Sequence, residues 1–200
     1  MAEIYLAEPV DGVAGWREFR TARDKLFREH PQSALEPDDR ERLDTLPFFE
    51  YDVQYRVQAT LVPDADDGEV TIDTGGEDGI LHYRRVARLG TPFGELTMFW
   101  LTGYAGGLFM PFRDLTSGSA TYGAGRYLLD TIKGTFGRGV VLHADHAVVD
   151  FNYAYNPSCA YDWRYACPLA PRENWLTVPI RAGEQTYSGR SEPGSTGDLG

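Results

Sequence analysis

The middle of this chain consists of short segments in which apolar and polar residues alternate, separated by turns rich in glycine and aspartate. Alternation with a period of two places every second side chain on one face of an extended strand. The longest such segment covers residues 51–62, and further strands are expected at 69–73, 80–89, 94–101 and 107–114. Strands at this spacing are typical of an antiparallel sandwich or a barrel-like sheet, so the fold is predicted to be mainly β.

The N-terminal region has the periodicity of a helix instead. Residues 13–29 carry an aromatic stripe that runs from Trp16 to Phe27 at helical spacing. Pro31 ends this helix, and residues 37–43 are expected to form a shorter one, with acidic residues early, where the helix dipole favours them. The N-terminal helices are expected to pack against the sheet.

Two arginines, Arg20 and Arg23, lie inside the aromatic stripe. Their stems can cover the edge of the core while the guanidinium groups reach water or an acidic neighbour. Alternatively, they form an inward-facing clamp for an anion, because the guanidinium fork matches carboxylates and phosphates.

Length and composition restrict the domain plan and the partners. We expect one β-rich domain with an N-terminal helix over residues 1–185, and a disordered tail over 186–200. No apolar run approaches the roughly 18–20 residues that span a bilayer, and the acidic N-terminus lacks the basic region of a signal peptide, so a cytoplasmic protein is expected. The formal net charge is −11 without a basic stripe, so neither nucleic acid nor a membrane is expected as a partner. Acid excess with few lysines suggests a halophile-like cytoplasm.

The segment 150–156 has an unusual polar pattern. If it is a strand, Asp150, Asn152 and Asn156 lie on one face, and aromatic residues lie on the other. Aspartate and asparagine are poor strand residues, and a plain solvent-exposed face would more naturally carry other polar residues. The pattern therefore indicates a polar site.

Three blocks of the chain resemble the domain-of-unknown-function family numbered sixteen eighty-four, which is found in bacteria and archaea. They are Trp16-Arg-Glu-Phe-Arg-Thr-Ala-Arg23-Asp-Lys-Leu-Phe27, the run from Phe112-Arg-Asp-Leu-Thr-Ser-Gly118 to Tyr127-Leu128, and the run from Asp150-Phe-Asn152 through Cys159 and Cys167-Pro168 to Glu184. The resemblance spans about residues 14 to 185 and implies no particular activity. Position 23 is arginine where the family pattern has lysine, which weakens any role that needs a deprotonatable amine.

Histidine and cysteine offer a weaker signal. His143, His146, Cys159 and Cys167 are the residue types of a zinc site, but seven residues separate the cysteines, so no metal site is predicted. The cysteines are expected to be a buried structural pair, and the alternatives are a nucleophile, which needs a thiolate, or a disulfide.

The remaining candidates surround the polar segment. Two cations, Arg113 and Arg126, and two acids, Asp114 and Asp150, form either a buried ion-pair network or the wall of a pocket. Nearby aromatic residues could line that pocket, among them Tyr122. The pair Glu173-Asn174 lies in a proline-bounded loop that could cap the pocket, and a last strand is expected at 176–181.

Two functional hypotheses follow. In the first, a small polar or anionic molecule binds between the hairpin 112–126 and the strand 150–156. Arg113 or Arg126 would hold the anion, Asn152 and Asn156 would orient it, and Asp150 would be the general base of any reaction. In the second, the same residues form an inert network that stiffens a β scaffold, which acts as an interaction or assembly module and forms a homodimer through exposed strand edges. No cofactor is identified by the sequence.

Overall fold

The computed structural model describes residues 12–64, 68–73, 80–102, 106–131 and 138–189. Its helices are α2 (Gly12–Glu29) and α3 (Pro37–Arg42), with single 3₁₀ turns η1 (Val53–Tyr55), η2 (Phe151–Tyr153), η3 (Ser158–Ala160) and η4 (Arg172–Asn174). Its strands are β1 (Arg56–Pro63), β2 (Glu69–Asp73), β3 (Ile80–Thr91), β4 (Gly94–Leu101), β5 (Gly107–Phe112), β6 (Arg126–Asp130), β7 (Val140–Leu142) and β8 (His146–Asp150). The mainly β fold with N-terminal helices is therefore confirmed.

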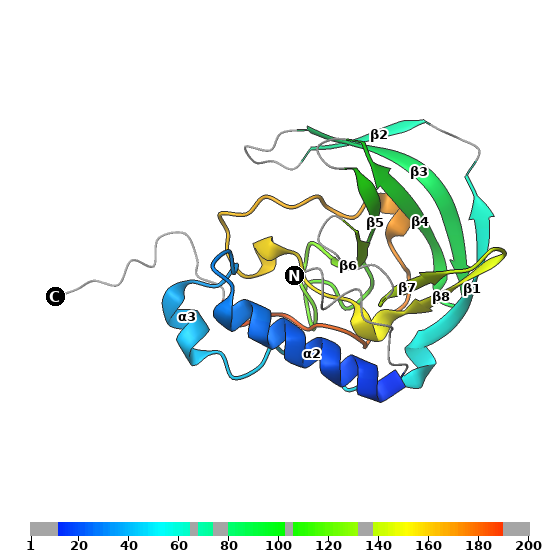
Figure 1. The fold of residues 1–200 in the computed structure, drawn as a ribbon. Helices are drawn as coiled ribbons and strands as arrows, with labels where there is room; N and C mark the ends of the chain where they lie inside the picture. The colour runs from blue at the N-terminus through cyan, green and yellow to red at the C-terminus, as the bar shows by residue number, and fades with distance from the viewer. Residues whose placement is uncertain (1–11, 65–67, 74–79, 103–105, 132–137, 190–200) are drawn as a thin grey trace.

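The strands form one antiparallel sheet in the order β6-β5-β4-β3-β1-β8-β7, and β2 pairs with the first five residues of β3. The sheet curls until its two end strands approach each other, which gives a nearly closed barrel (Figure 1). Gly139, just before β7, lies so close to β6 that a Cβ atom there would be 2.4 Å from the carbonyl oxygen of Leu128. A residue without a side chain thus permits the close approach of the barrel ends.

Both faces of β5 and β6 and of the middle of β4 are largely buried. One face carries the aliphatic core of the barrel, to which β4 contributes Leu96 and Met98. The other face carries a smaller aromatic cluster that includes Phe99 and Tyr127. The Tyr127 hydroxyl donates to the Pro168 carbonyl at 3.0 Å, so the long C-terminal segment covers this second face.

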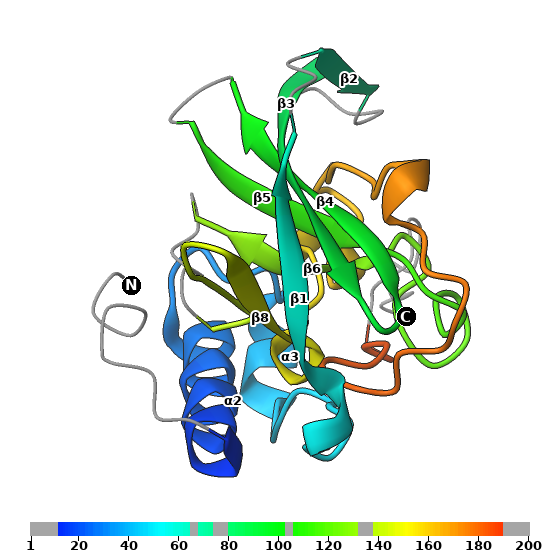
Figure 2. The ribbon, with the colours of Figure 1, turned by 90° about the vertical axis from the view of Figure 1, so that its right-hand side faces the viewer.

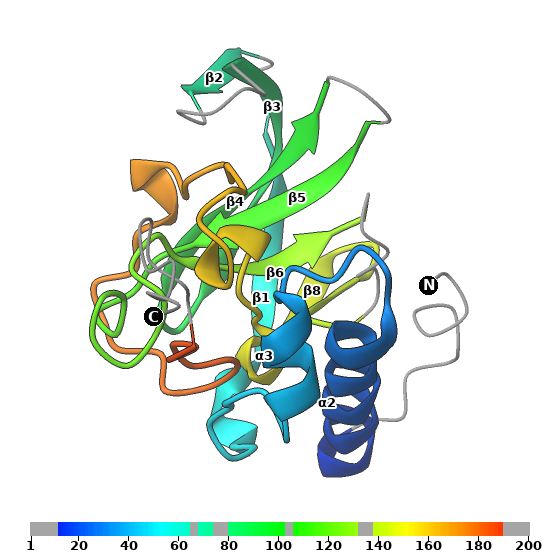
Figure 3. The same cartoon turned by 90° about the vertical axis from the view of Figure 1, so that its left-hand side faces the viewer.

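Helix α2 packs beside the open side of the barrel, next to α3 (Figure 2, Figure 3). Its buried stripe, including Trp16 and Phe19, contacts Phe48, Tyr153 and Tyr161. Phe19 meets Tyr153 edge-on, with 5.2 Å between ring centroids. The predicted helix and its apolar face are confirmed.

Arg23 lies within that buried stripe and is only 7% exposed. Its Nε donates to the Glu184 carboxylate at 3.1 Å, and its Nη2 donates to the Asn156 carbonyl and to the Tyr161 hydroxyl. The guanidinium group therefore reaches an acidic neighbour of the same chain, as in the first of the two sequence interpretations. This ion pair fastens α2 to the C-terminal segment.

Besides the segment 150–156, which is described with the candidate site, two predicted strands are wrong in part or in full. Residues 53–55 form η1, because the Asp52 carboxylate accepts the Gln54 amide at 2.9 Å and caps a 3₁₀ turn, so β1 begins only at Arg56. Residues 176–181 form no strand. They run alongside 113–115 and share only a few main-chain hydrogen bonds with it, such as Leu115 N to Val178 O at 3.2 Å.

The Arg23–Glu184 pair predicts a large effect of one substitution on stability. Arg23→Leu should lower the free energy of unfolding by about 3 kcal/mol or more, because it leaves the Glu184 carboxylate buried without its cation. Arg17→Leu, at an exposed position of the same helix, should change it by less than about 0.5 kcal/mol. Urea unfolding of both variants measures this free energy. Equal losses in the two variants would contradict a stabilising role of the Arg23–Glu184 ion pair.

Candidate functional site

Asp150 and Asn152 lie in a turn, and the predicted strand over 150–156 is wrong. The chain leaves β8 at Asp150 and enters η2, where the Asp150 Oδ1 accepts both the main-chain N–H and the side-chain Nδ2 of Asn152, at 3.0 and 2.8 Å. An aspartate that caps a short helical turn gives the same alternation of polar and aromatic residues as a strand with one polar face.

The rest of the Asn152 amide is bonded to the main chain of Asp52. Its Oδ1 accepts the Asp52 N–H at 3.0 Å, and its Nδ2 donates to the Asp52 carbonyl at 2.8 Å. This pairing reproduces the two hydrogen bonds that a neighbouring strand would make. Asn152 is fully buried, so its amide holds the chain before β1 to the chain after β8.

Asn156 lies elsewhere, beside Glu184. Its main-chain N–H donates to the Glu184 carboxylate, and its Nδ2 donates to the Gln185 carbonyl, both at 2.8 Å. Its Oδ1 is buried without a hydrogen-bond partner among the described residues. Glu184 is fully buried and also accepts from Arg23 and from the Tyr161 hydroxyl. Burial raises the pKa of Tyr161 well above its usual value, so the phenol stays protonated and can donate.

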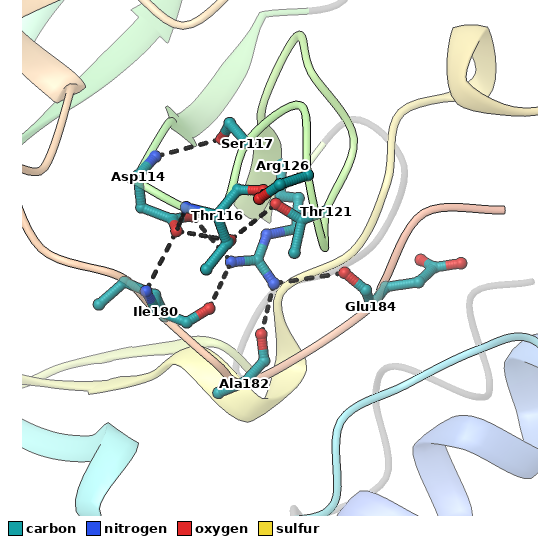
Figure 4. Close-up of polar contacts among 9 residues, drawn as sticks. Asp114, Thr116, Ser117, Thr121, Arg126, Ile180, Ala182 and Glu184 are labelled. Carbon is teal, nitrogen blue, oxygen red and sulfur yellow. Dashed lines mark hydrogen bonds and ion pairs between the residues drawn. The ribbon is translucent and has the colours of Figure 1, made fainter.

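Arg126 and Asp114 form a buried ion pair (Figure 4). The Arg126 Nη2 donates to the Asp114 Oδ2 at 2.9 Å and to the Ile180 carbonyl at 3.0 Å. Its Nη1 donates to the Ala182 carbonyl and, at 3.3 Å, to the Glu184 carbonyl. Burial lowers the pKa of Arg126, and the Asp114 carboxylate opposes that shift. One guanidinium group thus binds three carbonyls of the C-terminal segment.

The other oxygen of Asp114 organises the connection before β6. Its Oδ1 accepts the N–H and the hydroxyl of Thr116, at 2.8 and 2.6 Å, and the N–H of Ile180 at 3.1 Å (Figure 4). The Thr116 hydroxyl also contacts that of Thr121 at 2.8 Å. All these atoms are buried, so the carboxylate has no side open to a ligand.

Asn174 and Glu173 connect the C-terminal segment to the sheet. The Asn174 Oδ1 accepts the Thr97 N–H at 2.7 Å, while its Nδ2 donates to the carbonyls of Thr97 and Pro111 at 2.8 and 2.7 Å. The amide therefore fills the place between β4 and β5 where their direct pairing ends. Glu173 forms a bidentate salt bridge with Arg85, with N–O distances of 2.9 and 2.8 Å.

The side chains of Arg113 and Tyr122 make other contacts. The Arg113 guanidinium lies over the Trp175 ring, 4.4 Å from its centroid. The Tyr122 hydroxyl donates to the Cys159 carbonyl at 3.2 Å. The structure thus divides the predicted residues into separate groups. Asp114, Arg126 and Asn156 meet around Glu184, Asp150 and Asn152 meet around Asp52, and Glu173 and Asn174 lie on β3 and β4.

The Asp150 carboxyl group has a shifted pKa and is almost inaccessible to solvent. Burial raises its pKa, and the hydrogen bonds from Asn152 and the charge of Arg56, whose Nε lies 3.8 Å away, oppose the rise. Its exposed fraction is 3%. A general base needs to reach the proton that it removes, whereas the Asp150 Oδ1 already accepts two hydrogen bonds from Asn152.

The cysteines are a buried, unbridged pair. The Cys159 N–H donates to the Cys167 Sγ at 3.3 Å. The hydrogen bond with Cys167 and burial raise the pKa of the Cys159 thiol, which opposes formation of a nucleophilic thiolate. His143 and His146 stack on each other, with 4.4 Å between ring centroids. Across the part of the chain that the structure describes, no three His, Cys, Asp or Glu side chains gather as metal ligands would.

An open hollow of about 610 Å³ lies on the surface near the start of α2, beside the turn that contains Asp150 and Asn152. It is lined by Val13, Phe49, Glu50, Tyr51, Asp52, Val53 and Arg181. The predicted residues that come nearest to it are Asn152, through the Asp52 main chain, and Asp150, which accepts a hydrogen bond from Tyr51.

The chain belongs to the family described as "Protein of unknown function (DUF1684)", whose profile matches residues 41–185. It is also similar to an uncharacterized protein of Haloarcula marismortui solved by solution NMR, with 35% identity and a TM-score of 0.63. That match covers 86% of this chain and 93% of the other. A search of curated proteins found no match. The resemblance read from the sequence is therefore confirmed, and the family supplies no assigned activity.

None of the described helices is long and apolar enough to cross a membrane.

The sequence did not identify Glu184, whose carboxylate lies at the centre of the contacts with Arg23, Asn156 and Tyr161. It closes the third block of the resemblance, and that position was the only sequence signal for it. Its partner Arg23 lies 161 positions away, so no local pattern could pair the two.

The raised pKa of Asp150 predicts a pH dependence of stability. Because the folded-state pKa exceeds the ordinary value of 3.8, Asp150 stabilises the fold most below that value, and this contribution is lost as the pH rises through the folded pKa. The unfolding free energy of the wild type minus that of Asp150→Asn should therefore fall from about pH 4 upward, by at most about 1.4 kcal/mol per pH unit. Asp44→Asn, at an exposed carboxylate, is the control. A difference that rises with pH would show that the sign of the shift is wrong.

Proposed function

We propose that this domain is a non-catalytic β scaffold that acts through its outer surface as an interaction or assembly module. One observation supports this proposal above others. The side chains that most resemble catalytic groups are enclosed and bonded mainly to the main chain of the same domain. Exposed fractions are 3% for Asp150, 1% for Arg126, and 0% for Asn152 and Asn174.

The chemistry of such groups explains why burial matters. A residue that binds or transforms a ligand needs a free lone pair or N–H that points into an accessible space. Both polar atoms of the Asn174 amide already bond to main-chain groups of β4 and β5. The hydrogen-bonding capacity of the Asn174 amide therefore goes into holding the C-terminal segment to the barrel, which suits a structural role.

The scaffold proposal makes a direct prediction for Asn152. Asn152→Ala should lower the free energy of unfolding by about 2–4 kcal/mol, because the buried Asp150 carboxylate and the half-buried Asp52 N–H and carbonyl each lose a partner. Gln54→Ala, at an exposed position nearby, should change it by less than about 0.5 kcal/mol. Native mass spectrometry of the wild type should show the mass of the polypeptide alone. A retained small molecule that is lost in Asn152→Ala, with stability unchanged, would overturn the scaffold proposal.

A second candidate function is small-molecule binding in the open hollow. The observation in its favour is that Arg181 lines the hollow and that its side chain makes no hydrogen bond or ion pair with the described residues. Glu50 and Asp52 line the same hollow, so a polar molecule with both an anionic and a cationic group matches it best. Tyr51 and Phe49 would supply apolar contact area.

Arg181→Gln tests this second function. It should weaken a ligand found by screening small zwitterions in a thermal-shift assay by about tenfold, because it removes the cation that holds the anionic group. Arg42→Gln, at another exposed arginine, is the matched control. Equal affinities for both variants would remove the hollow from consideration.

A further inference from the structure

An exposed tryptophan lies beneath two arginines at one end of the barrel. Trp175 is 41% exposed, and its ring Nε1 donates to the Ala170 carbonyl at 2.8 Å, which fixes the ring. The guanidinium carbons of Arg113 and Arg172 lie 4.4 and 5.1 Å from the ring centroid. Stacking on an indole holds a guanidinium group in place while leaving its N–H donors at the rim.

Those donors are unused within the part of the chain that the structure describes. Neither the Arg113 nor the Arg172 side chain makes a hydrogen bond or ion pair there, although both retain their cation–π contact. The adjacent acid, Glu173, is already occupied by Arg85 at 2.8 Å and by the Thr97 hydroxyl. Two fixed cations thus remain available on a chain with a net charge of −11.

An exposed apolar residue lies two positions after Arg113. Leu115 is 65% exposed, and its main chain runs parallel to the Trp175 segment through the Arg113–Trp175 bridge. Tryptophan and arginine are the residue types most enriched among those that dominate the energetics of protein interfaces. A surface of arginine, tryptophan and leucine, exposed instead of enclosed, suits a polypeptide better than a small anion, which would require a concave site.

We propose that Arg113, Leu115, Arg172 and Trp175, together called the Arg–Trp surface, bind an acidic peptide segment of a partner protein. Carboxylates of the segment would accept from the guanidinium forks, and an apolar side chain would lie on Trp175 and Leu115. This inference rests on the scaffold function and names the class of partner that the scaffold would recognise. Acidic segments occur in this chain as well, so self-association is one of the outcomes to be measured.

The test uses the full chain and a fluorescein-labelled hexaglutamate peptide with one leucine at each end. Fluorescence anisotropy should show binding that weakens as NaCl is raised from about 50 to 500 mM. Arg113→Gln with Arg172→Gln should weaken binding at least about tenfold, whereas Arg17→Gln with Arg42→Gln, an equal loss of charge at exposed positions, should weaken it less than about twofold. Arg113→Lys with Arg172→Lys, which keeps the charge without the planar fork, should give an intermediate loss.

Several results would overturn the inference. Equal weakening by the two glutamine pairs would show general electrostatic attraction only, and equal binding of a glutamine version of the peptide would show that acid is not recognised. No binding by the wild type at about millimolar concentration would also overturn it. Inorganic phosphate that displaces the peptide at the same concentration as the peptide itself would indicate a small-anion site instead. A dimer in light scattering that Trp175→Ala dissociates would make a second copy the partner.

These outcomes are separate from those of the scaffold proposal. A failed peptide titration leaves the stability change of Asn152→Ala untouched, whereas a retained small molecule would refute the scaffold role whether or not the peptide binds. Circular dichroism of each arginine variant should match the wild type, because neither side chain contributes a hydrogen bond to the described fold.

Discussion

The buried guanidinium group of Arg126 is the interaction on which the rest of the structure depends. It lies at the start of β6, and it gathers the carbonyls of Ile180, Ala182 and Glu184 from a segment that has no regular pairing of its own. Asp114 balances the charge and at the same time shapes the connection before β6. An unpaired guanidinium group in this place would carry a large desolvation penalty, so the packing of the C-terminal segment against β6 depends on these contacts.

The other buried polar residues solve the same physical problem. After β8 the chain makes three single 3₁₀ turns and no strand among its described residues, yet it is largely buried against the barrel. Buried main-chain N–H and carbonyl groups need partners, and outside a sheet these come from side chains. Asn152, Asn174 and Glu184 supply them, each for a different stretch of chain. The amides of Asn152 and Asn174 thereby take the place of strand pairing.

The sheet could be predicted from the sequence because its strands are bounded by turns. Residues 69–73 and 94–101 form β2 and β4 as expected. The segment after Asp150 was misread because a capped 3₁₀ turn, buried on all sides, imitates a period of two. The clustering of Asp114 with Arg126 was expected, whereas the enclosure of both depends on Ile180 and Glu184, far away in sequence. Residues 190–200 of the expected tail lie outside the described residues, while Thr186 donates to the Ala120 carbonyl at 3.1 Å.

The most direct test of the account is the free energy of unfolding of Arg126→Met, measured by urea denaturation with the slope of the transition compared to that of the wild type. A structural Arg126 predicts a loss of about 3 kcal/mol or more, or failure to fold, because the Asp114 carboxylate and three carbonyls lose their common donor. A residue kept for ligand chemistry would behave differently, since groups at functional sites often reduce stability. An Arg126→Met protein as stable as the wild type, or more stable, would contradict the account.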